Sequence, residues 1–174
     1  ELDALRPPHA AEAIAIACDA GAPAIHVRTE LHSDSACETL LAAKPEVISI
    51  DLHADTPETY RLVRGLDEHA AVVRRIDRLI DARTSLPNGL VAQWIIPRLT
   101  RRDAVYAEVE PFYDRWLMRA GAAIIDALPG PVAGERIEPL PLPVNAAARL
   151  HRSTFRIDVQ GALHTPEHAP EQRP

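Results

Sequence analysis

Three side chains with metal-ligating chemistry alternate along one short stretch, EVISIDLHADTPETYRLVRG, which spans residues 46–65. Asp51, His53 and Asp55 offer carboxylate and imidazole donors of the kind that bind divalent metals. A spacing of two along an extended chain places them on one side. A closed metal site would need further ligands from elsewhere, and Asp55 or Thr56 could simply cap the helix that follows.

The elements predicted around this cluster place it between the end of a strand and the start of a helix. The apolar run at residues 47–50 predicts a buried strand, and Thr56-Pro57-Glu58 predicts the start of a helix that Gly65 ends. In α/β folds, the carboxyl end of a strand is where functional sites gather. We therefore expect the polar residues after residue 50 to line a site.

The rest of the chain alternates predicted helices with predicted strands. The spacing of apolar residues predicts helices at 8–20, 34–43, 56–64, 68–83 and 101–120, and strands at 24–29, 46–51, 90–96 and 121–127. A capping box at Ser35–Glu38 marks the start of the second helix, and Pro111 predicts a kink or break in the last one. This alternation predicts an α/β fold with parallel strands and right-handed crossovers.

Four strands cannot close a barrel, so the predicted sheet has open edges. Unpaired backbone at such an edge favours self-association, and it also suggests that part of the fold lies outside this sequence. The chain begins with Glu1, and its one methionine is Met118. We expect it to be the C-terminal portion of a longer protein.

The same stretch resembles the middle of a radical S-adenosylmethionine (radical SAM) enzyme barrel. Residues 54–65, ADTPETYRLVRG, are similar to the family segment ATPETYxxxRG, which follows a strand of the form xVxxSLDG. Residues 12–38 resemble the segment AKEAGIPVxLxTNG, although Glu30-Leu31 replaces its Asn-Gly. The opening ELDALRPPHAAEAI resembles GEPLLHPDFxEI. The resemblance covers roughly residues 1–127 and implies a partial, TIM-like radical SAM barrel.

The resemblance implies two groups of site residues. The cofactor S-adenosylmethionine would be held by Thr29, Ser49, Asp51 and Gln93. The substrate would be contacted by Glu30, His53 and Arg98. Arg98 also stands out by its charge, because with Arg101 and Arg102 it places three positive charges at a predicted helix start, which favours an anionic partner nearby.

The family generates its radical at a [4Fe–4S] cluster, and the ligands of that cluster are not in this sequence. The chain has two cysteines, Cys18 and Cys37, whereas a cubane cluster needs three or four thiolates at one point. The CxxxCxxC segment would lie upstream of Glu1. We therefore expect the isolated chain to carry out no radical chemistry; whether it acts as an enzyme depends on that missing part.

The character of the sequence changes after Leu128. We expect a partial barrel at 1–128, a Pro-rich linker at 129–145, an auxiliary segment at 146–163 and a disordered tail at 164–174. The third of these resembles the entry to a SPASM-like auxiliary domain, with Arg149, Arg152 and Gly161 in place. The cysteines of that domain are missing, so it would be a small, irregular and degenerate segment.

Composition excludes several classes of protein. The formal net charge of −6 argues against a nucleic-acid surface, and no apolar run approaches the length of a membrane span. Two cysteines provide no disulfide framework, so we expect a cytoplasmic protein. The resemblance implies that it acts on a small molecule or peptide.

Two other functions stay open. The chain could be a cluster-less, non-catalytic binding module that kept the barrel to hold a peptide or partner enzyme. It could also be a metal-dependent hydrolase or isomerase on an α/β barrel, using Asp51, His53 and Asp55 with His26 or His32.

Overall fold

The computed structural model describes residues 10–83, 92–128, 132–138, 156–157 and 163–164. The chain divides into two compact units, Glu1–Pro139 and Leu140–Pro174. The first unit holds all the elements that position the candidate site.

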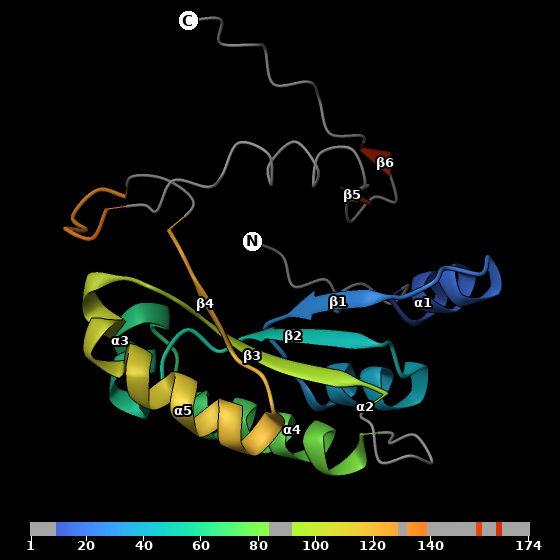
Figure 1. Cartoon of the computed structure of the whole chain (residues 1–174), viewed down its shortest axis with the longest axis horizontal. Helices are drawn as coiled ribbons and strands as arrows, with labels where there is room; N and C mark the ends of the chain where they lie inside the picture. The colour runs from blue at the N-terminus through green and yellow to red at the C-terminus, as the bar shows by residue number, and fades with distance from the viewer. Residues whose placement is uncertain (1–9, 84–91, 129–131, 139–155, 158–162, 165–174) are drawn as a thin grey trace, which may run out of the picture. The chain divides into compact units, whose positions relative to one another are not determined.

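The first unit is built on a four-stranded parallel sheet (Figure 1). Its strands are β1 (His26–Thr29), β2 (Val47–Asp51), β3 (Trp94–Thr100) and β4 (Ile124–Asp126). They lie side by side in the order of the sequence, β1-β2-β3-β4, and every neighbouring pair is parallel. The prediction of parallel strands separated by helices is confirmed.

The connecting helices form a layer on one side of this sheet. They are α2 (Asp34–Ala43), α4 (His69–Ala82) and α5 (Val109–Ala120), with the shorter α3 (Pro57–Arg64) before α4. Figure 1 shows α2, α4 and α5 on the same side of the strands, and α1 (Ala10–Asp19) packs beside α2.

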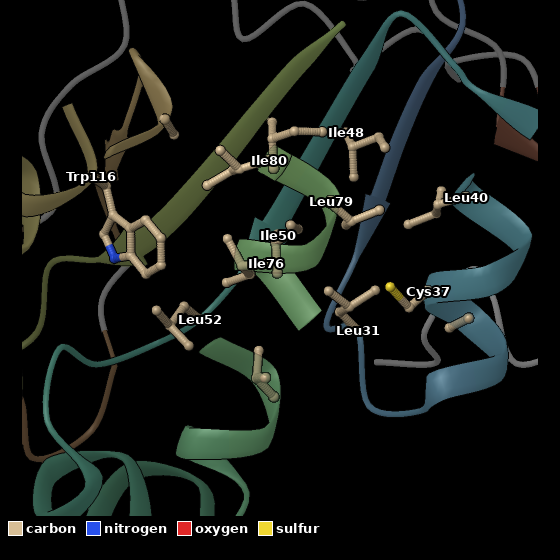
Figure 2. Packing of buried hydrophobic residues seen from close by; sticks show 14 of the residues in the cluster. Leu31, Cys37, Leu40, Ile48, Ile50, Leu52, Ile76, Leu79, Ile80 and Trp116 are labelled. Atoms are coloured by element: carbon tan, nitrogen blue, oxygen red, sulfur yellow. The ribbon is translucent and has the colours of Figure 1, made fainter. Parts of the chain in front are cut away.

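The main core lies between this helical layer and the sheet. Ile48 and Ile50 of β2 are fully buried and meet the apolar stripe of α4, which presents Ile76, Leu79 and Ile80 (Figure 2). Farther along, Leu31 packs near Cys37 and Leu40 of α2. Burying an aliphatic side chain of this size contributes roughly 1.5–3 kcal/mol. The helix-side face of the sheet is therefore set by alternate apolar residues.

The other face of the sheet carries the intervening residues. Strand register places His26 and Arg28 beside Val47 and Ser49, and Asp51 beside Arg98. Among the described residues, no helix lies over this face in Figure 1. Parallel sheets are normally covered on both sides, so a second face whose carboxyl half is charged needs a separate explanation.

Local sequence accounts for the start of α2 and α3. Thr56 caps α3 by accepting a hydrogen bond from the Thr59 N–H, Pro57 follows as the first helical residue, and Gly65 ends the helix at φ 69°. The N-cap of α2 is Ser33, whose Oγ accepts from Ala36 N–H. The capping box predicted at Ser35–Glu38 is therefore wrong by two residues, because the serine with extended backbone geometry comes earlier.

The third strand begins later than the sequence predicts. The prediction ended it at Ile96, before Pro97, but β3 runs from Trp94 to Thr100. Trp94 N–H donates to the carbonyl of Glu46, the residue before β2, so by alternation the nitrogen of Pro97 points toward β4. Pairing with β4 starts only at Arg98, and the N–H that Pro97 lacks is not needed there.

The segment predicted as one helix at 101–120 is divided. A 3₁₀ helix, η1 (Asp103–Glu108), is followed by α5, and Pro111 lies in the first turn of α5, where its missing N–H costs least. The predicted break is confirmed, although it falls at the junction before Pro111.

The C-terminal unit contains two short antiparallel strands, β5 (Arg156–Ile157) and β6 (Leu163–His164). Arg149, Arg152 and Gly161 lie outside the described residues, as does the predicted tail 164–174 except for His164, which belongs to β6. Part of the predicted linker, 132–138, is attached to the first unit: Glu135 accepts from Arg102 and the Asp103 N–H. No helix in the described part of the chain is long and apolar enough to cross a membrane.

Candidate functional site

The carboxyl edge of β1 and β2 gathers a compact group of ionisable side chains. Glu30 and His32 follow β1 directly, His53 follows β2, and Arg64 comes from the last turn of α3. The parallel arrangement explains this placement, because the carboxyl ends of neighbouring parallel strands meet at one edge.

Glu30 is the centre of this group. Its carboxylate accepts hydrogen bonds from His32 Nε2 and Arg64 Nη2, both short, and its Oε1 lies 3.6 Å from His53 Nε2. His32 Nδ1 contacts the half-exposed Glu68 at 3.2 Å. Glu30 is thus a mostly enclosed anion held by one guanidinium and one imidazole, with a second imidazole just beyond hydrogen-bonding distance.

Unusual backbone geometry presents these side chains. Leu31 has φ 54° and His53 has φ 68°, a left-handed region that residues with a Cβ seldom adopt. The first of these turns is stabilised by Thr29, whose Oγ1 accepts from Leu31 N–H at 2.9 Å. Because Leu31 is also fully buried, packing holds the chain in a conformation that would suit glycine better.

Glu30 and His53 differ in their charge state. Burial acts to raise the pKa of Glu30, but the hydrogen bond from His32 and the charge of Arg64 outweigh it and hold that pKa below its ordinary value. The pKa of His53 is lowered, first by burial and then by Arg64, although Asp51 and Glu30 oppose the shift. At neutral pH, Glu30 is therefore ionised and His53 is neutral.

A row of alternating charges crosses the second face of the sheet beside this group. Asp51 accepts two hydrogen bonds from Arg28, at 2.8 and 3.0 Å, and Arg98 binds Asp126 in the same bidentate way, at 2.9 and 2.6 Å. Arg98 Nε also lies 3.5 Å from Asp51 Oδ1. The row therefore spans all four strands, and its charges are paired with each other.

A neutral pair lies next to this row. His26 Nε2 is 2.5 Å from the buried Ser49 Oγ. Partial burial of the ring lowers the pKa of His26, and the charges of Arg98 and Arg28 lower it further. His26 is thus a neutral imidazole whose ring orients the Ser49 hydroxyl.

The loop that follows His53 is held by residues of the segments that follow β3, η1 and α5. Glu108, at the end of η1, accepts from Asp55 N–H at 2.7 Å and from Thr56 Oγ1 at 2.5 Å. Arg115 lies 3.1 Å from the buried Asp55 Oδ1, an ion pair without hydrogen-bond geometry. Burial raises the pKa of Asp55 even so, and Glu108 adds to the shift.

The structure brings together most of the residues that the sequence singled out. Glu30 and His53 lie within ion-pair distance of each other, and Ser49, Asp51 and Arg98 share the second face of the sheet. These five predicted residues occupy one continuous region around the carboxyl half of β2.

Two predicted residues are placed elsewhere. Thr29 is buried on the helix side, where its hydroxyl stabilises the turn at Leu31. Gln93 precedes β3 at the opposite, amino edge of the sheet, and its Nε2 donates to Pro45 O at 3.0 Å. The strand shift at β3 causes this second separation, because the predicted strand 90–96 included Gln93, whereas β3 begins only at Trp94.

Four residues of the site had no assigned role: Arg28, Arg64, Glu68 and Asp126. Arg28 and Asp126 lie on predicted strands, and their alternation with apolar neighbours was an available signal. Arg64 and Glu68 reach Glu30 and His32 only through the packing of α3 and α4, which no local pattern reveals.

The donors in the described part of the chain do not form a metal site or a cluster site. Within the described ranges, no group of three or more His, Cys, Asp or Glu side chains is arranged to hold a metal ion. Cys37 is buried in the core and Cys18 is exposed on α1, and two thiols are too few for a [4Fe–4S] cluster. This chain alone does not fit the cluster.

Two shallow hollows in the described part of the chain lie away from the candidate site. One is lined by Asp103, Tyr106, Ala107, Arg136 and Ile137, beyond the 3₁₀ helix, and the other lies along α4. The candidate residues instead contact each other directly. In comparisons with protein-family models, curated proteins and solved structures, nothing matches this chain.

Proposed function

We propose that this chain is a segment of a radical SAM enzyme that supplies part of the S-adenosylmethionine and substrate pockets for the modification of a small molecule or peptide. The observation that carries the proposal is the arrangement of the sheet. Four parallel strands follow one another in sequence order, with helices α2, α4 and α5 on one side. The carboxyl half of the other face carries charged residues. A doubly wound sheet would reverse its order and carry helices on both sides, whereas a barrel does neither.

In this proposal the second face of the sheet is the inner wall of a barrel. That placement accounts for a face which carries Arg28, Asp51, Arg98 and Asp126 without a helical layer among the described residues. The TPETY segment that resembles the family forms the start of α3, directly after the polar end of β2. Leu31, at the position of the family's glycine, has φ 54°, the conformation in which glycine is favoured.

Fewer residues are placed to bind S-adenosylmethionine than the sequence predicted. Asp51 lies between two arginines, so this part of the face offers both charges to a zwitterionic ligand, and Ser49 adds a hydroxyl. Thr29 and Gln93 make internal hydrogen bonds away from that face. The substrate side would involve Glu30, His53 and Arg98. The cluster must come from residues outside this sequence.

The proposal is tested first in the gene. We expect an in-frame CxxxCxxC upstream of the Glu1 codon, within about 100 residues, the length of two strand–helix units of a barrel. A stop codon followed by a start near Glu1 would contradict the proposal and make a cluster-less binding module the leading alternative. Cleavage of S-adenosylmethionine by the reconstituted chain alone would contradict it as well.

The pocket is tested on the protein that carries the upstream segment. We expect S-adenosylmethionine to raise the Tm of that protein, because a ligand that binds only the folded state stabilises it. Ser49→Ala should reduce the shift, whereas Ser35→Ala, an exposed serine on α2, should leave it unchanged. Equal Tm shifts in both variants would show that Ser49 does not contribute to the pocket.

A further inference from the structure

The contacts of His53 differ from those of the other histidines near the site. Its Nε2 is enclosed and has no hydrogen-bond partner in the described part of the chain, and Glu30 Oε1 lies 3.6 Å from it. Nδ1 makes no hydrogen bond to a described residue either, but it is not enclosed, and 21% of the side chain is exposed. One nitrogen therefore faces a carboxylate and the other faces solvent.

Glu30 is held so that it can orient this ring. Arg64 and His32 both donate to its carboxylate, and His32 is held in turn by Glu68. These contacts fix the carboxylate and keep it ionised, which is the state needed to accept a hydrogen bond from an imidazole without taking its proton. Glu30 thus combines a fixed position with a stable negative charge.

We propose that Glu30 and His53 form a carboxylate–imidazole dyad, in which Glu30 accepts a hydrogen bond from His53 Nε2–H and leaves Nδ1 as the proton acceptor toward a bound ligand. The distance of 3.6 Å shortens to a hydrogen bond with a movement of less than about 1 Å.

The chemistry of this dyad is a single proton transfer. A ligand with a weakly acidic O–H or N–H group loses its proton to His53 Nδ1, and the electron pair of the broken bond stays on the ligand. The imidazolium that forms is stabilised by Glu30 and Asp51 and opposed by Arg64, the charged groups that act on it from β1, β2 and α3. The proton can return to water because Nδ1 is accessible.

The lowered pKa of His53 supports this role, because a neutral ring has a free acceptor nitrogen at physiological pH. The inference rests on the proposed function only for the presence of a substrate over this edge. The dyad itself is a property of the described residues and can be measured in the ligand-free chain.

The test is the protonation state of His53 in the full-length chain, measured by ¹⁵N NMR of the imidazole rings over pH and assigned with His53→Asn. In the wild type above the titration of His53, we expect the proton on Nε2, with a slowly exchanging downfield resonance. Glu30→Gln should abolish that resonance and lower the pKa of His53 further. Asp67→Asn, a matched change at an exposed carboxylate paired with Arg61, should alter neither.

Three outcomes would overturn the dyad: a proton on Nδ1 in the wild type, no protected Nε2 proton, or the same titration of His53 in Glu30→Gln. If Glu30→Gln does not fold, the wild-type spectrum alone decides, because it reports both the tautomer and the protection. Failure here leaves the thermal shift at Ser49 unaffected, so the dyad and the proposed function can be rejected separately.

Discussion

At the scale of single residues, Arg98 connects β3 to both neighbouring strands through their carboxylates. It binds Asp126 through two hydrogen bonds and approaches Asp51, which is itself bound by Arg28. Only 14% of its side chain is exposed, so solvent screens these contacts weakly. A planar guanidinium can satisfy Asp126 in bidentate fashion and still face Asp51, whereas an ammonium group cannot match that geometry.

Arg98→Lys should therefore lower the free energy of unfolding by about 1–3 kcal/mol, the range for losing a charge-assisted hydrogen bond. Urea unfolding measures this directly. Arg119→Lys is the matched control, because Arg119 also bridges two aspartates, Asp77 and Asp81, but is 45% exposed. We expect a much smaller change there, because solvent screens an exposed ion pair. Equal losses would show that the row of charges on the sheet is no stronger than a surface pair.

At the scale of elements, helix α3 connects the two halves of the candidate region. Its last turn carries Arg64 to Glu30, and its first turn is held by Glu108 from η1. Glu108 supplies an anion to the N-terminus of a helix, where backbone N–H groups lack partners. Hydrogen bonds from Thr56, Thr59 and the backbone overcome the effect of burial and lower the pKa of Glu108.

Glu108→Gln should lower the free energy of unfolding by about 1–3 kcal/mol, because the amide cannot replace a carboxylate that accepts several hydrogen bonds. Since the folded-state pKa lies below 4.5, this contribution is present above that pH and is lost as pH falls through the folded pKa. The difference from wild type should thus shrink in acid. Glu110→Gln, at an exposed position two residues later, should change little.

At the scale of the whole molecule, most of the buried ionisable groups discussed above make stability fall as pH falls. His53 and His69 have pKa values below 6.5, chiefly because burial disfavours their charged forms, and Glu30 and Glu108 have pKa values below 4.5. In every case the unfolded chain binds more protons than the folded chain. Asp55 acts in the opposite sense, because burial raises its pKa.

The free energy of unfolding should therefore fall as pH drops below about 6.5 and fall again below about 4.5. Urea midpoints measured across this range will show both steps. His69→Phe keeps the aromatic contact with Tyr60 and removes one of the groups that cause the first step, so its midpoint should depend less on pH between about 7 and about 5. An unchanged slope would mean that His69 is not neutral in the folded protein.

The sequence by itself determined the elements and their order. Apolar runs and helical spacing predicted four strands and the helices between them. Thr56-Pro57 with Gly65 placed α3 at 56–64, one residue longer at its start than the observed Pro57–Arg64. Such signals are local, since caps, proline and glycine act within one turn. The same signals led to errors where packing overrides them, as at Pro97, which lies inside β3 because that side of the strand has no ladder to interrupt.

Only the tertiary structure decided which charges meet. Glu30 and Arg64 are 34 positions apart, and Arg98 and Asp126 are 28 apart, yet each pair forms hydrogen bonds. No periodicity encodes these contacts, because they depend on strand register and on how α3 packs at the end of the sheet. For the same reason, Gln93 was expected at the site and lies at the other edge, whereas Glu30 and His53, each expected from its own strand end, were brought face to face by the sheet.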